Sequence, residues 1–411
     1  MKKFSCTLCM SGSKSLIFSI GNVLLGIKKH SPHLFDRIVI YTEVLPDNDK
    51  NALKSIFEYV EIVEYFPKFN TYLSEIYSDS TNKGARMPCF VYADFEIFNL
   101  IKDSKKVVYL DSDILIKGDI SNILNYVDEQ NCIAMRKIAS KLDVAVGTID
   151  PNLSKSPFYN AGVIVINEHE KFSNFANECY KIAAEYAKTN AYCDQSSLVI
   201  ACHRNNIKIS MLPVIYNNNI NCSDCFNNVI VHQNMKAKFW NQGVVNALFP
   251  EWNENDEQWR TLGGTPFSGV KYRWEYKDLF KKGMKVKLNN LVSAYEVLIK
   301  QFFDKLSEDL LTRKQILNSK KIGKNSLLFN VFQNDKEYIN FRLTSSMSYL
   351  VVELQTSYDL DINKVPDNFL EEGKISFKYS ESQILFKSKY DDFVEEFIKF
   401  VNFARLILPK D

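Results

Sequence analysis

The sequence predicts an α/β protein, with a mixed sheet flanked by helices and a small α+β domain in the C-terminal part. Over residues 1–275, short apolar runs alternate with segments of helix length, which is typical of a mostly parallel sheet covered on both faces. From residue 321 on, strand-like runs are separated by turn-like breaks, which favours antiparallel strands. The chain has 411 residues, 46% of them hydrophobic and 24% charged, and this composition is typical of a folded protein with more than one core.

The N-terminal part is predicted to alternate strands and helices in a regular order. The strands are short runs rich in apolar and β-branched residues, at 4–10, 37–42, 60–65, 107–116, 132–135 and 162–166, with two more around Ile209 and Val229. The helices, at 15–29, 49–59, 90–101, 169–188 and 195–203, carry apolar residues at helical spacing. Because ligands of such sheets bind beyond the carboxyl ends of the strands, the residues that follow each strand are the first candidates for a site.

The sequence changes character after residue 275. Residues 276–320 are predicted to form a basic helical connector, because the stretch 277–324 holds 12 Lys and Arg residues against 5 Asp and Glu residues. An apolar stripe at helical spacing runs through this stretch at Leu288, Leu291, Tyr295, Leu298, Phe302, Leu306 and Leu310. Residues 321–411 follow as an antiparallel α+β domain of unknown role, with strands at 327–333, 338–343, 349–355, 375–379 and 384–387 and an amphipathic helix at 392–408.

Charge and hydropathy exclude some classes of protein. The formal net charge of +2 argues against a partner that is a nucleic acid. No apolar segment is long enough to span a bilayer, so we expect a cytoplasmic protein. The basic stretch 277–324 could lie peripherally on the anionic inner face of a membrane, although a solvated helix face or a dimer contact explains it more simply. The oligomeric state is not readable from the sequence.

The cysteines are expected to be buried free thiols. There are nine of them, an odd number, and most lie inside apolar runs. The spacing of Cys6 and Cys9, and that of Cys222 and Cys225, also permits a zinc site. The first pair lies in a predicted strand, however, where residues three apart face opposite sides.

The most informative stretch is Val107-Val-Tyr-Leu-Asp111-Ser-Asp113-Ile-Leu-Ile116, an apolar strand that carries two acids. Burying unpaired carboxylates is costly, so folding alone does not explain these two residues. Where the chain bends at the end of a strand, both acids can converge on one ion. We therefore expect a divalent metal with oxygen ligands, which usually also binds phosphate oxygens.

Three further patches place polar residues beside predicted strands or at the start of a helix. His232 ends an apolar strand and Lys238 follows six residues later; imidazole is a common metal ligand, and a lysine can reach phosphate oxygens. Asn160 and Gly162 come just before a buried strand, where a glycine permits close approach to a ligand. The Asp-Gln pair at 194–195 opens a helix, where the acid could equally be an N-cap. A histidine and a lysine in such positions can also be purely structural or solvated.

In this order the four patches resemble the motifs of glycosyltransferase family 8, whose members are retaining enzymes that use nucleotide sugars. The matching residues are Val-Tyr-Leu-Asp111-Ser-Asp113, Tyr159-Asn160-Ala-Gly162, Asp194-Gln195 and His232 with Lys238-Phe-Trp240. Each motif is weak alone, but four in the same order and spacing over about residues 1–275 are fairly specific. The resemblance implies a GT-A-type, Rossmann-like fold for this part of the chain and a role in polysaccharide biosynthesis. Residues 320–411 resemble no family that we recognise.

The resemblance also implies a metal cofactor and a binding site for the donor. Asp111, Asp113 and His232 would hold Mn²⁺ or Mg²⁺ against the donor diphosphate. The donor-binding candidates are Thr7, Arg86, Leu110, Ser112, Gly162 and Lys238. Lys238 would help to neutralise the departing nucleoside diphosphate, as the metal would.

The residues around the transferred sugar are implied in the same way. Asn160 and Asp194 would hydrogen-bond the sugar hydroxyls, and Gln195 would lie near the anomeric carbon. Because an amide is a poor nucleophile, we expect front-face displacement, in which the leaving phosphate assists the acceptor, in place of a covalent intermediate. The expected reaction moves a hexose from a nucleoside diphosphate sugar, a UDP-sugar above all, to a glycan or a lipid-linked saccharide.

Several positions depart from the family pattern. The acid that usually contacts uracil is missing after the first strand, where this chain has Thr7-Leu-Cys-Met-Ser-Gly. A basic residue usually lies about seventeen positions before the first metal aspartate, where this chain has Asp94; Arg86 or Lys83 could take its place. The family's phenylalanine, glycine and proline near the last motif are replaced by Gln233, Met235 and Phe239.

Two other functions stay open on the sequence alone. A haloacid-dehalogenase-type phosphatase also has Asp-x-Asp after a strand, with Asp111 as nucleophile and Asp113 as general acid. That class places its motif early in the chain and needs a late acidic pair, for which only Asp391-Asp392 is available. The departures from the family pattern also permit a non-catalytic protein that binds a sugar or a partner on the same scaffold.

Overall fold

The computed structural model describes residues 3–141, 153, 156–188, 193–218, 228–234, 238–243 and 249–271, together with strands at 273–274 and between 316 and 389. The chain divides into two compact units. The first comprises Met1–Ile220, Asn227–Trp240 and Phe249–Lys271, and the second comprises Asn221–Phe226, Asn241–Leu248 and Tyr272–Asp411. Among the described residues, no helix has the length and apolar character needed to cross a membrane.

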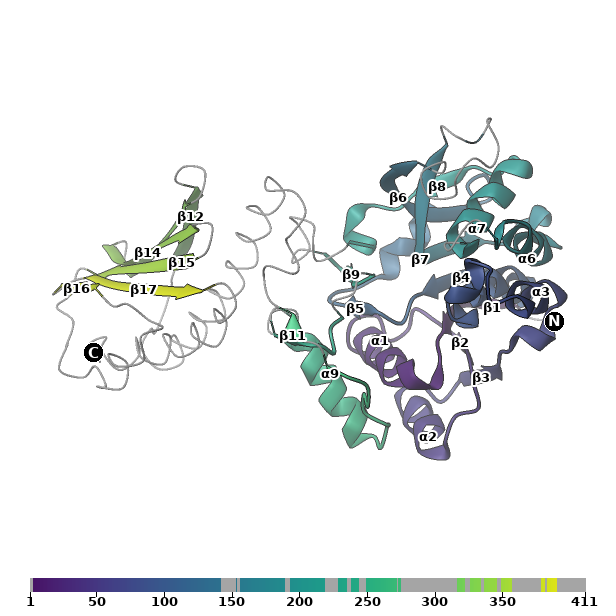
Figure 1. Ribbon diagram of the computed structural model, residues 1–411, viewed down its shortest axis with the longest axis horizontal. Coiled ribbons are helices and arrows are strands. Elements are labelled where there is room, and N and C mark those ends of the chain that lie inside the picture. The colour runs from purple at the N-terminus through teal and green to yellow at the C-terminus, as the bar shows by residue number, and fades with distance from the viewer. Residues whose placement is uncertain are drawn as a thin grey trace. The chain divides into compact units, whose positions relative to one another are not determined.

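The first unit is built on a seven-stranded sheet with the strand order β3-β2-β1-β4-β7-β6-β8 (Figure 1). Its strands are β1 (Phe4–Ser11), β2 (Arg37–Thr42), β3 (Val60–Glu64), β4 (Ser104–Leu110), β6 (Ile133–Lys141), β7 (Pro157–Asn167) and β8 (Ile209–Met211). β1 is parallel to β2 and β4, β2 to β3, and β6 to β8, whereas β7 is antiparallel to β4 and β6. This topology confirms the predicted α/β class with a mixed sheet.

Helices flank this sheet on both sides. The α-helices are α1 (Ile17–His30), α2 (Asp47–Ile56), α3 (Thr71–Ser78), α4 (Ile97–Leu100), α6 (Phe175–Tyr186), α7 (Cys193–Arg204) and α9 (Pro250–Thr261). One buried core joins α3, α4, α6 and α7 to strand residues such as Val107, Tyr109 and Ile164. α1 packs instead against α2, α9 and the short strand β5 (Ile114–Ile116) (Figure 1).

The apolar run 107–116 forms two strands, so the prediction of one continuous strand is wrong. β4 ends at Leu110, and residues 111–113 make a turn into β5. β5 leaves the main sheet and pairs antiparallel with β9 (Ile230–His232). The interruption falls at the two acids because carboxylates inside a buried strand would lose their hydration without a partner. The metal-type motif therefore lies at the carboxyl end of β4, in a turn.

The predicted helix at 90–101 is mostly of the 3₁₀ type. It consists of η4 (Cys89–Glu96), the single turn α4 and η5 (Ile101–Asp103). In a 3₁₀ helix the side chains of residues three apart lie above one another. Tyr92 and Phe95, which are both fully buried, can therefore face the core together. The prediction of a helix holds in position but not in type.

The second unit contains a six-stranded sheet with the order β12-β13-β14-β15-β17-β16, in which every neighbouring pair is antiparallel. Its strands are β12 (Ile316–Lys321), β13 (Ser326–Gln333), β14 (Lys336–Ser345), β15 (Tyr349–Thr356), β16 (Lys378–Ser380) and β17 (Gln383–Lys389). Two further short strands, β10 (Gln242–Gly243) and β11 (Arg273–Trp274), pair in parallel. The predicted final helix at 392–408 and residues 276–315 of the predicted connector lie outside the described residues, and the domain boundaries stay predictions.

Candidate metal and donor site

Three potential metal ligands meet at the carboxyl end of β4. The turn after β4 carries Asp111 and Asp113, and the pairing of β5 with β9 places His232 opposite Ile114. Nε2 of His232 lies 3.0 Å from Oδ1 of Asp113 and 3.3 Å from Oδ2 of Asp111. One ligand atom from each of the three residues lies within 4.8 Å of the others. The structure thus brings together the three residues that were predicted to hold the metal.

Gly162 allows the side chains of His232 and Asp111 to lie this close to the strand β7. Its carbonyl oxygen accepts a hydrogen bond from the backbone N–H of Asp111, with an N–O distance of 2.9 Å, where β4 ends beside β7. A Cβ atom added at Gly162 would lie 2.8 Å from Oδ2 of Asp111 and 2.5 Å from Nδ1 of His232. Real Cβ atoms do not come so close, so only glycine lets the imidazole pack against this strand.

Asn217, which the sequence analysis did not single out, links the metal-type cluster to the sugar-binding candidates. Its Oδ1 lies 2.9 Å from Nδ1 of His232, and its Nδ2 donates to Oδ1 of Asn160 at 2.8 Å. An amide oxygen can only accept, so Nδ1 of His232 carries the proton and Nε2 faces the carboxylates. The available signal was the run of three asparagines at 217–219, which directly follows an apolar segment.

Replacement of Asn217 with leucine is expected to weaken Mn²⁺ binding about 10- to 100-fold, the usual effect of losing the group that orients a metal-binding histidine. Leucine has a similar size but cannot accept the Nδ1 proton of His232. Isothermal titration with Mn²⁺ measures the effect. Asn125→Leu, at an exposed position on η6 (Ser121–Tyr126), is the matched control. Equal affinities in the two variants would show that Asn217 does not orient the histidine.

Tyr109 is a second residue that sequence reasoning missed. Its hydroxyl donates to Oδ1 of Asp111 at 3.0 Å and lies 2.9 Å from Oγ of Ser11, which in turn donates to the carbonyl oxygen of Phe90. Tyr109 lies in the predicted apolar strand, and nothing in its spacing indicates the hydroxyl contact. The contact fixes the Asp111 side chain, whose exposed fraction of 36% would otherwise leave it free to rotate.

The ionisable groups of the cluster shift one another's pKa values strongly. Burial lowers the pKa of His232, but the carboxylates of Asp113 and Asp111 outweigh this effect and raise it to about 9. Burial raises the pKa of Asp113, but His232 and Lys238 hold it below its ordinary value. Lys238 forms an ion pair with Asp113 and donates to the backbone oxygen of Gln233 at 2.7 Å. Without a metal, the cluster therefore holds a protonated imidazole between two carboxylates at neutral pH.

Metal binding is expected to strengthen as the pH rises. A metal ligand must be neutral imidazole, and the raised pKa of about 9 means that His232 has to release a proton below that pH. The Mn²⁺ affinity should therefore increase about tenfold per pH unit between pH 6 and 8, with close to one proton released per metal. Titration calorimetry in buffers of different ionisation enthalpy measures both quantities. In His232→Asn the slope should disappear; a slope that persists in this variant would assign it to another group.

Asn160 and Gln195 lie side by side beyond Asn217. Asn160, on β7, donates from Nδ2 to Oε1 of Gln195 at 3.3 Å and accepts from the backbone N–H of Gly162 at 3.1 Å. The same Gln195 oxygen accepts from the backbone N–H of Ala161 at 3.3 Å. Gln195 and Asp194 lie in the first turn of α7. Burial raises the pKa of Asp194 to about 7, assisted by the charge of Asp111.

The other donor-binding candidates differ from one another in burial and in their contacts. Leu110 and Ser112 flank Asp111, with Leu110 buried at the end of β4. Arg86 is exposed on η3 (Gly84–Arg86), as is the neighbouring Lys83. Thr7 is fully buried in β1, and its Oγ1 lies 2.7 Å from Oγ of Ser104. The geometry thus gives the Thr7 hydroxyl a hydrogen bond inside the core, and the role of Thr7 in donor binding stays a prediction.

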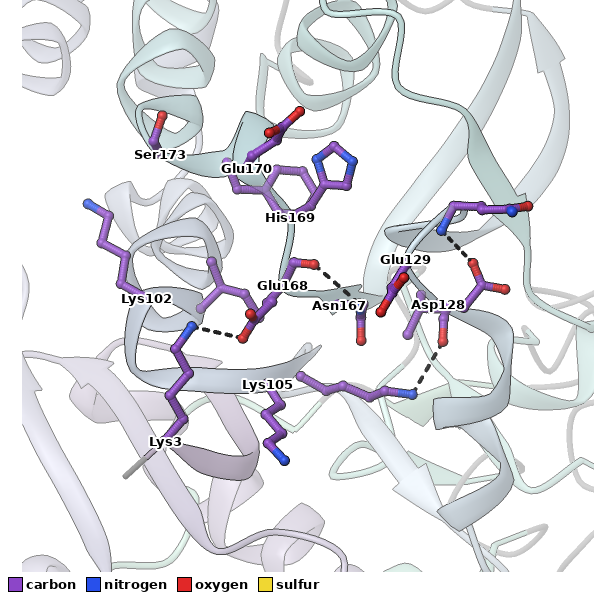
Figure 2. A pocket seen from close by; sticks show the side chains of 15 residues that line it. Lys3, Lys102, Lys105, Asp128, Glu129, Asn167, Glu168, His169, Glu170 and Ser173 are labelled. Carbon is purple, nitrogen blue, oxygen red and sulfur yellow. Dashed lines mark hydrogen bonds and ion pairs between the residues drawn. The ribbon is translucent and has the colours of Figure 1, made fainter. Parts of the chain in front are cut away.

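A wide groove of about 1260 Å³ lies at the opposite end of the sheet (Figure 2). It is lined by Lys3, just before β1, by the first residues of β4 and by Asn167, the last residue of β7. Two of its lysines have partners within the protein: Lys3 pairs with Glu168 at 2.8 Å, and Lys106 donates to the carbonyl oxygen of Leu124. We therefore place the functional site at the cluster of Asp111, Asp113 and His232, which lies at the other end of β4.

The donor set of the cluster fits a divalent metal. Two carboxylates and an imidazole nitrogen suit Mn²⁺ or Mg²⁺, and the second imidazole nitrogen is held by Asn217, as in metal-binding histidines. An α/β sheet with such a cluster beyond its central strand is typical of enzymes that bind ligands at the carboxyl ends of their strands. The sequence profile of glycosyl transferase family 8 matches residues 7–244, more than half of the chain. The protein therefore belongs to glycosyltransferase family 8, and the predicted resemblance is confirmed.

Solved structures of glycosyltransferases are similar to between 62% and 65% of the chain. The galactosyltransferase LgtC in complex with donor and acceptor sugar analogs is 15% identical, with 64% of this chain and 97% of that chain covered and a TM-score of 0.46. The bifunctional glycosyltransferase WbbM is 16% identical over 62% of this chain, with a TM-score of 0.45, and this chain spans half of its length. GlyE of Streptococcus pneumoniae is 17% identical, with 65% and 67% covered and a TM-score of 0.41. No curated protein matches the chain.

Proposed function

We propose that this protein is a retaining hexosyltransferase that uses a nucleoside diphosphate sugar, with UDP as the expected nucleotide. The acceptor would be a glycan or a lipid-linked saccharide. One observation carries this proposal: the hydrogen-bonded series from His232 through Asn217 and Asn160 to Gln195 connects a metal-type cluster to the residues implied to bind the sugar. Family membership also removes the phosphatase alternative, in which Asp111 would be a nucleophile.

Each residue of the cluster has a separate task in this proposal. Asp111, Asp113 and His232 would hold Mn²⁺ or Mg²⁺, which when bound supplies a Lewis acid for the leaving diphosphate. Lys238, beside Asp113, adds a positive charge where the nucleoside diphosphate departs. Asp194 and Asn160 would bind hydroxyl groups of the sugar. These interactions hold the reacting bond in place and offset the charge that develops on the leaving group.

Gln195 supports front-face displacement in this proposal. Its amide oxygen accepts from both Ala161 and Asn160, so it is held in a fixed position near the sugar-binding candidates. A neutral amide in that position can stabilise positive charge at the anomeric carbon through its oxygen, but it is a poor nucleophile. The leaving phosphate would then accept the proton of the acceptor hydroxyl on the same face. A glycosyl adduct on Gln195, trapped and located by mass spectrometry, would contradict this route.

A thermal-shift screen of nucleotide sugars with and without Mn²⁺ tests the proposal. A ligand that binds only the folded protein raises the melting temperature, so UDP-sugars are expected to do so only when Mn²⁺ is present. Donor hydrolysis with the same panel then tests catalysis. A non-catalytic binding protein would show the thermal shift with hydrolysis at background level for every donor.

A further inference from the structure

A cavity of about 580 Å³ lies between β6 and the segment that follows β8. One wall is formed by residues 136–138 of β6, and the other by residues 211–214. The pairing of β6 with β8 holds the two walls together, as does the backbone N–H of Leu212, which donates to the carbonyl oxygen of Met135 at 2.9 Å. Cavities of this volume commonly bind small molecules. The proposed function has so far given this one no role.

The cavity lies at the same edge of the sheet as the metal-type cluster. β7 is antiparallel to both β4 and β6, so β4 and β6 run in the same direction, and β8 is parallel to β6. The carboxyl ends of these strands therefore share one edge, where Asp111 follows β4 and Met211 ends β8. Met135 is the last residue of β6 that pairs with β8, so the residues from Arg136 on extend beyond β8 at this edge. Ligands of α/β sheets bind at such an edge.

Arg136 connects the cavity to the residues implied to bind the sugar. Its Nη1 donates to the backbone oxygen of Asn217. The side chain of Asn217 in turn donates to Oδ1 of Asn160 at 2.8 Å. Arg136 is also the cross-strand partner of Asn160 in the pairing of β6 with β7, and the Cβ atoms of such partners lie about 4.5–5.5 Å apart. A group bound by Arg136 in the cavity is therefore next to the proposed sugar site.

The cavity holds two cations, the half-buried Arg136 and the exposed Lys137, and no acid lines it. In the part of the chain that the structure describes, neither cation forms an ion pair, and Nε of Arg136 has no hydrogen-bond partner. A guanidinium group binds phosphate oxygens through two parallel hydrogen bonds, and an ammonium group adds a point charge. The charge of the cavity therefore fits an anionic ligand, and a phosphate in particular.

The rest of the cavity lining is apolar, and much of it is exposed. Met211 is 62% exposed and Val214 is 47% exposed, and the adjoining Ile215 is 40% exposed. Single exposed apolar residues are ordinary, but three within 211–215, beside a cavity, form an apolar patch. An apolar patch next to unpaired cations is complementary to a molecule that joins a negative group to a hydrocarbon chain.

We propose that this cavity binds the phosphate linkage of a lipid-linked acceptor. The phosphate contacts Arg136 and Lys137, and the first part of the lipid chain lies on Met211 and Val214. The acceptor saccharide, joined to the phosphate at Arg136, then extends towards Asn160. The inference rests on the proposed function and decides between its two classes of acceptor, since a free neutral glycan would leave both the cations and the apolar patch without a partner.

Binding of geranyl diphosphate to the full chain, measured by isothermal titration, tests the proposal. EDTA is present, because a metal at the cluster could also hold a diphosphate. The wild type should bind geranyl diphosphate at least about tenfold more tightly than inorganic diphosphate or geraniol, since each of these lacks one half of the interaction. Equal affinity for inorganic diphosphate would assign the cavity to free phosphates, and equal affinity for glucuronic acid would assign it to acidic glycans. Either result overturns the proposal.

Substitutions in the cavity locate the bound probe. Arg136→Gln and Lys137→Gln should each weaken geranyl diphosphate binding about tenfold, because each removes a charged phosphate contact. Val214→Ser should weaken it about threefold through the loss of apolar contact. Lys137 and Val214 are exposed, so their variants should fold even if the Arg136 variant does not.

Matched controls make the same changes outside the cavity. Lys208→Gln alters an exposed lysine just before β8, and Val63→Ser alters an exposed valine on β3, at the other edge of the sheet. Neither residue lines the cavity, so both variants should bind geranyl diphosphate like the wild type. If Lys137→Gln and Val214→Ser bind the probe as tightly as these controls do, the ligand is not in the cavity and the proposal is overturned.

Transfer assays separate a failure of this inference from a failure of the proposed function. With Mn²⁺ and the best donor of the panel, monosaccharides linked to geranyl diphosphate are compared with the same monosaccharides in free form. The linked acceptors should have a kcat/KM at least about tenfold higher, and Lys137→Gln should lose most of this advantage. Equal transfer to both forms by the wild type would overturn the inference and leave the function intact. Probe binding in the cavity, with every donor left unhydrolysed, would refute the proposed function and with it the acceptor role.

Discussion

Asp113→Asn is expected to lower Mn²⁺-dependent donor hydrolysis about a thousandfold. The side chain keeps its size but loses the charge that pairs with His232 and Lys238 and would pair with the metal. A Lewis-acid metal contributes several kcal/mol to the transition state, and each 1.36 kcal/mol corresponds to about a factor of ten in rate. The substitution leaves β4 and β5 untouched, so the fold should persist.

The measurement is the rate of release of the free nucleoside diphosphate from the best donor of the panel, at saturating Mn²⁺. Asp103→Asn, which makes the same change at an exposed position, should hydrolyse the donor like the wild type. A circular dichroism spectrum equal to that of the wild type confirms that Asp113→Asn is folded. Equal background-level hydrolysis in Asp113→Asn and the wild type would refute the enzymatic proposal, whatever ligands bind.

Gly162→Ala is expected to weaken Mn²⁺ binding strongly through packing alone. The added methyl group would meet Oδ2 of Asp111 at 2.8 Å and His232 at still shorter distances. Since Gly162 lies inside a buried strand, its backbone cannot move away, and the imidazole must leave the cluster. We expect the Mn²⁺ affinity to fall at least about a hundredfold, because one of the three ligands is displaced. Overpacking should also cost about 1–3 kcal/mol of stability.

Gly118→Ala is the matched control. A methyl group at Gly118 meets only Val229, at 3.7 Å, which is ordinary van der Waals contact. This variant should bind Mn²⁺ like the wild type and have a similar melting temperature. Calorimetric titration with Mn²⁺, well below the melting temperature of each variant, separates the loss of the site from the loss of stability. Wild-type affinity in Gly162→Ala would show that the imidazole does not need its present position.

Much of the fold could be predicted because it depends on local patterns. The strand at 37–42 was predicted with the bounds that the structure has for β2, since a short β-branched run flanked by polar residues has few alternatives. The break within 107–116 could not be predicted in the same way. Apolar residues on both sides of the acids satisfy the strand pattern, and only the pairing of β5 with β9 shows that the chain leaves the sheet there.

The residues of the candidate site also divide into those that could be predicted from the sequence and those that could not. Asp111, Asp113 and His232 were predicted from residue type and motif order, because ionisable groups beside apolar strands are costly unless they have a function. Asn217 and Tyr109 were missed, because an amide and a phenol are common in loops and strands and their importance depends on what they contact. Thr7 was predicted near the donor, which stays a prediction, and its hydroxyl bonds with Ser104 in the core.

The sequence by itself determined the α/β class, the family and the chemical types at the site, since hydrophobic periodicity and motif order are properties of the chain alone. The tertiary structure decided which groups touch. It placed His232 against two aspartates from a distant segment and made Gly162 indispensable. These features depend on distances of a few ångströms between residues far apart in the chain, and such distances arise only when the strands and helices pack.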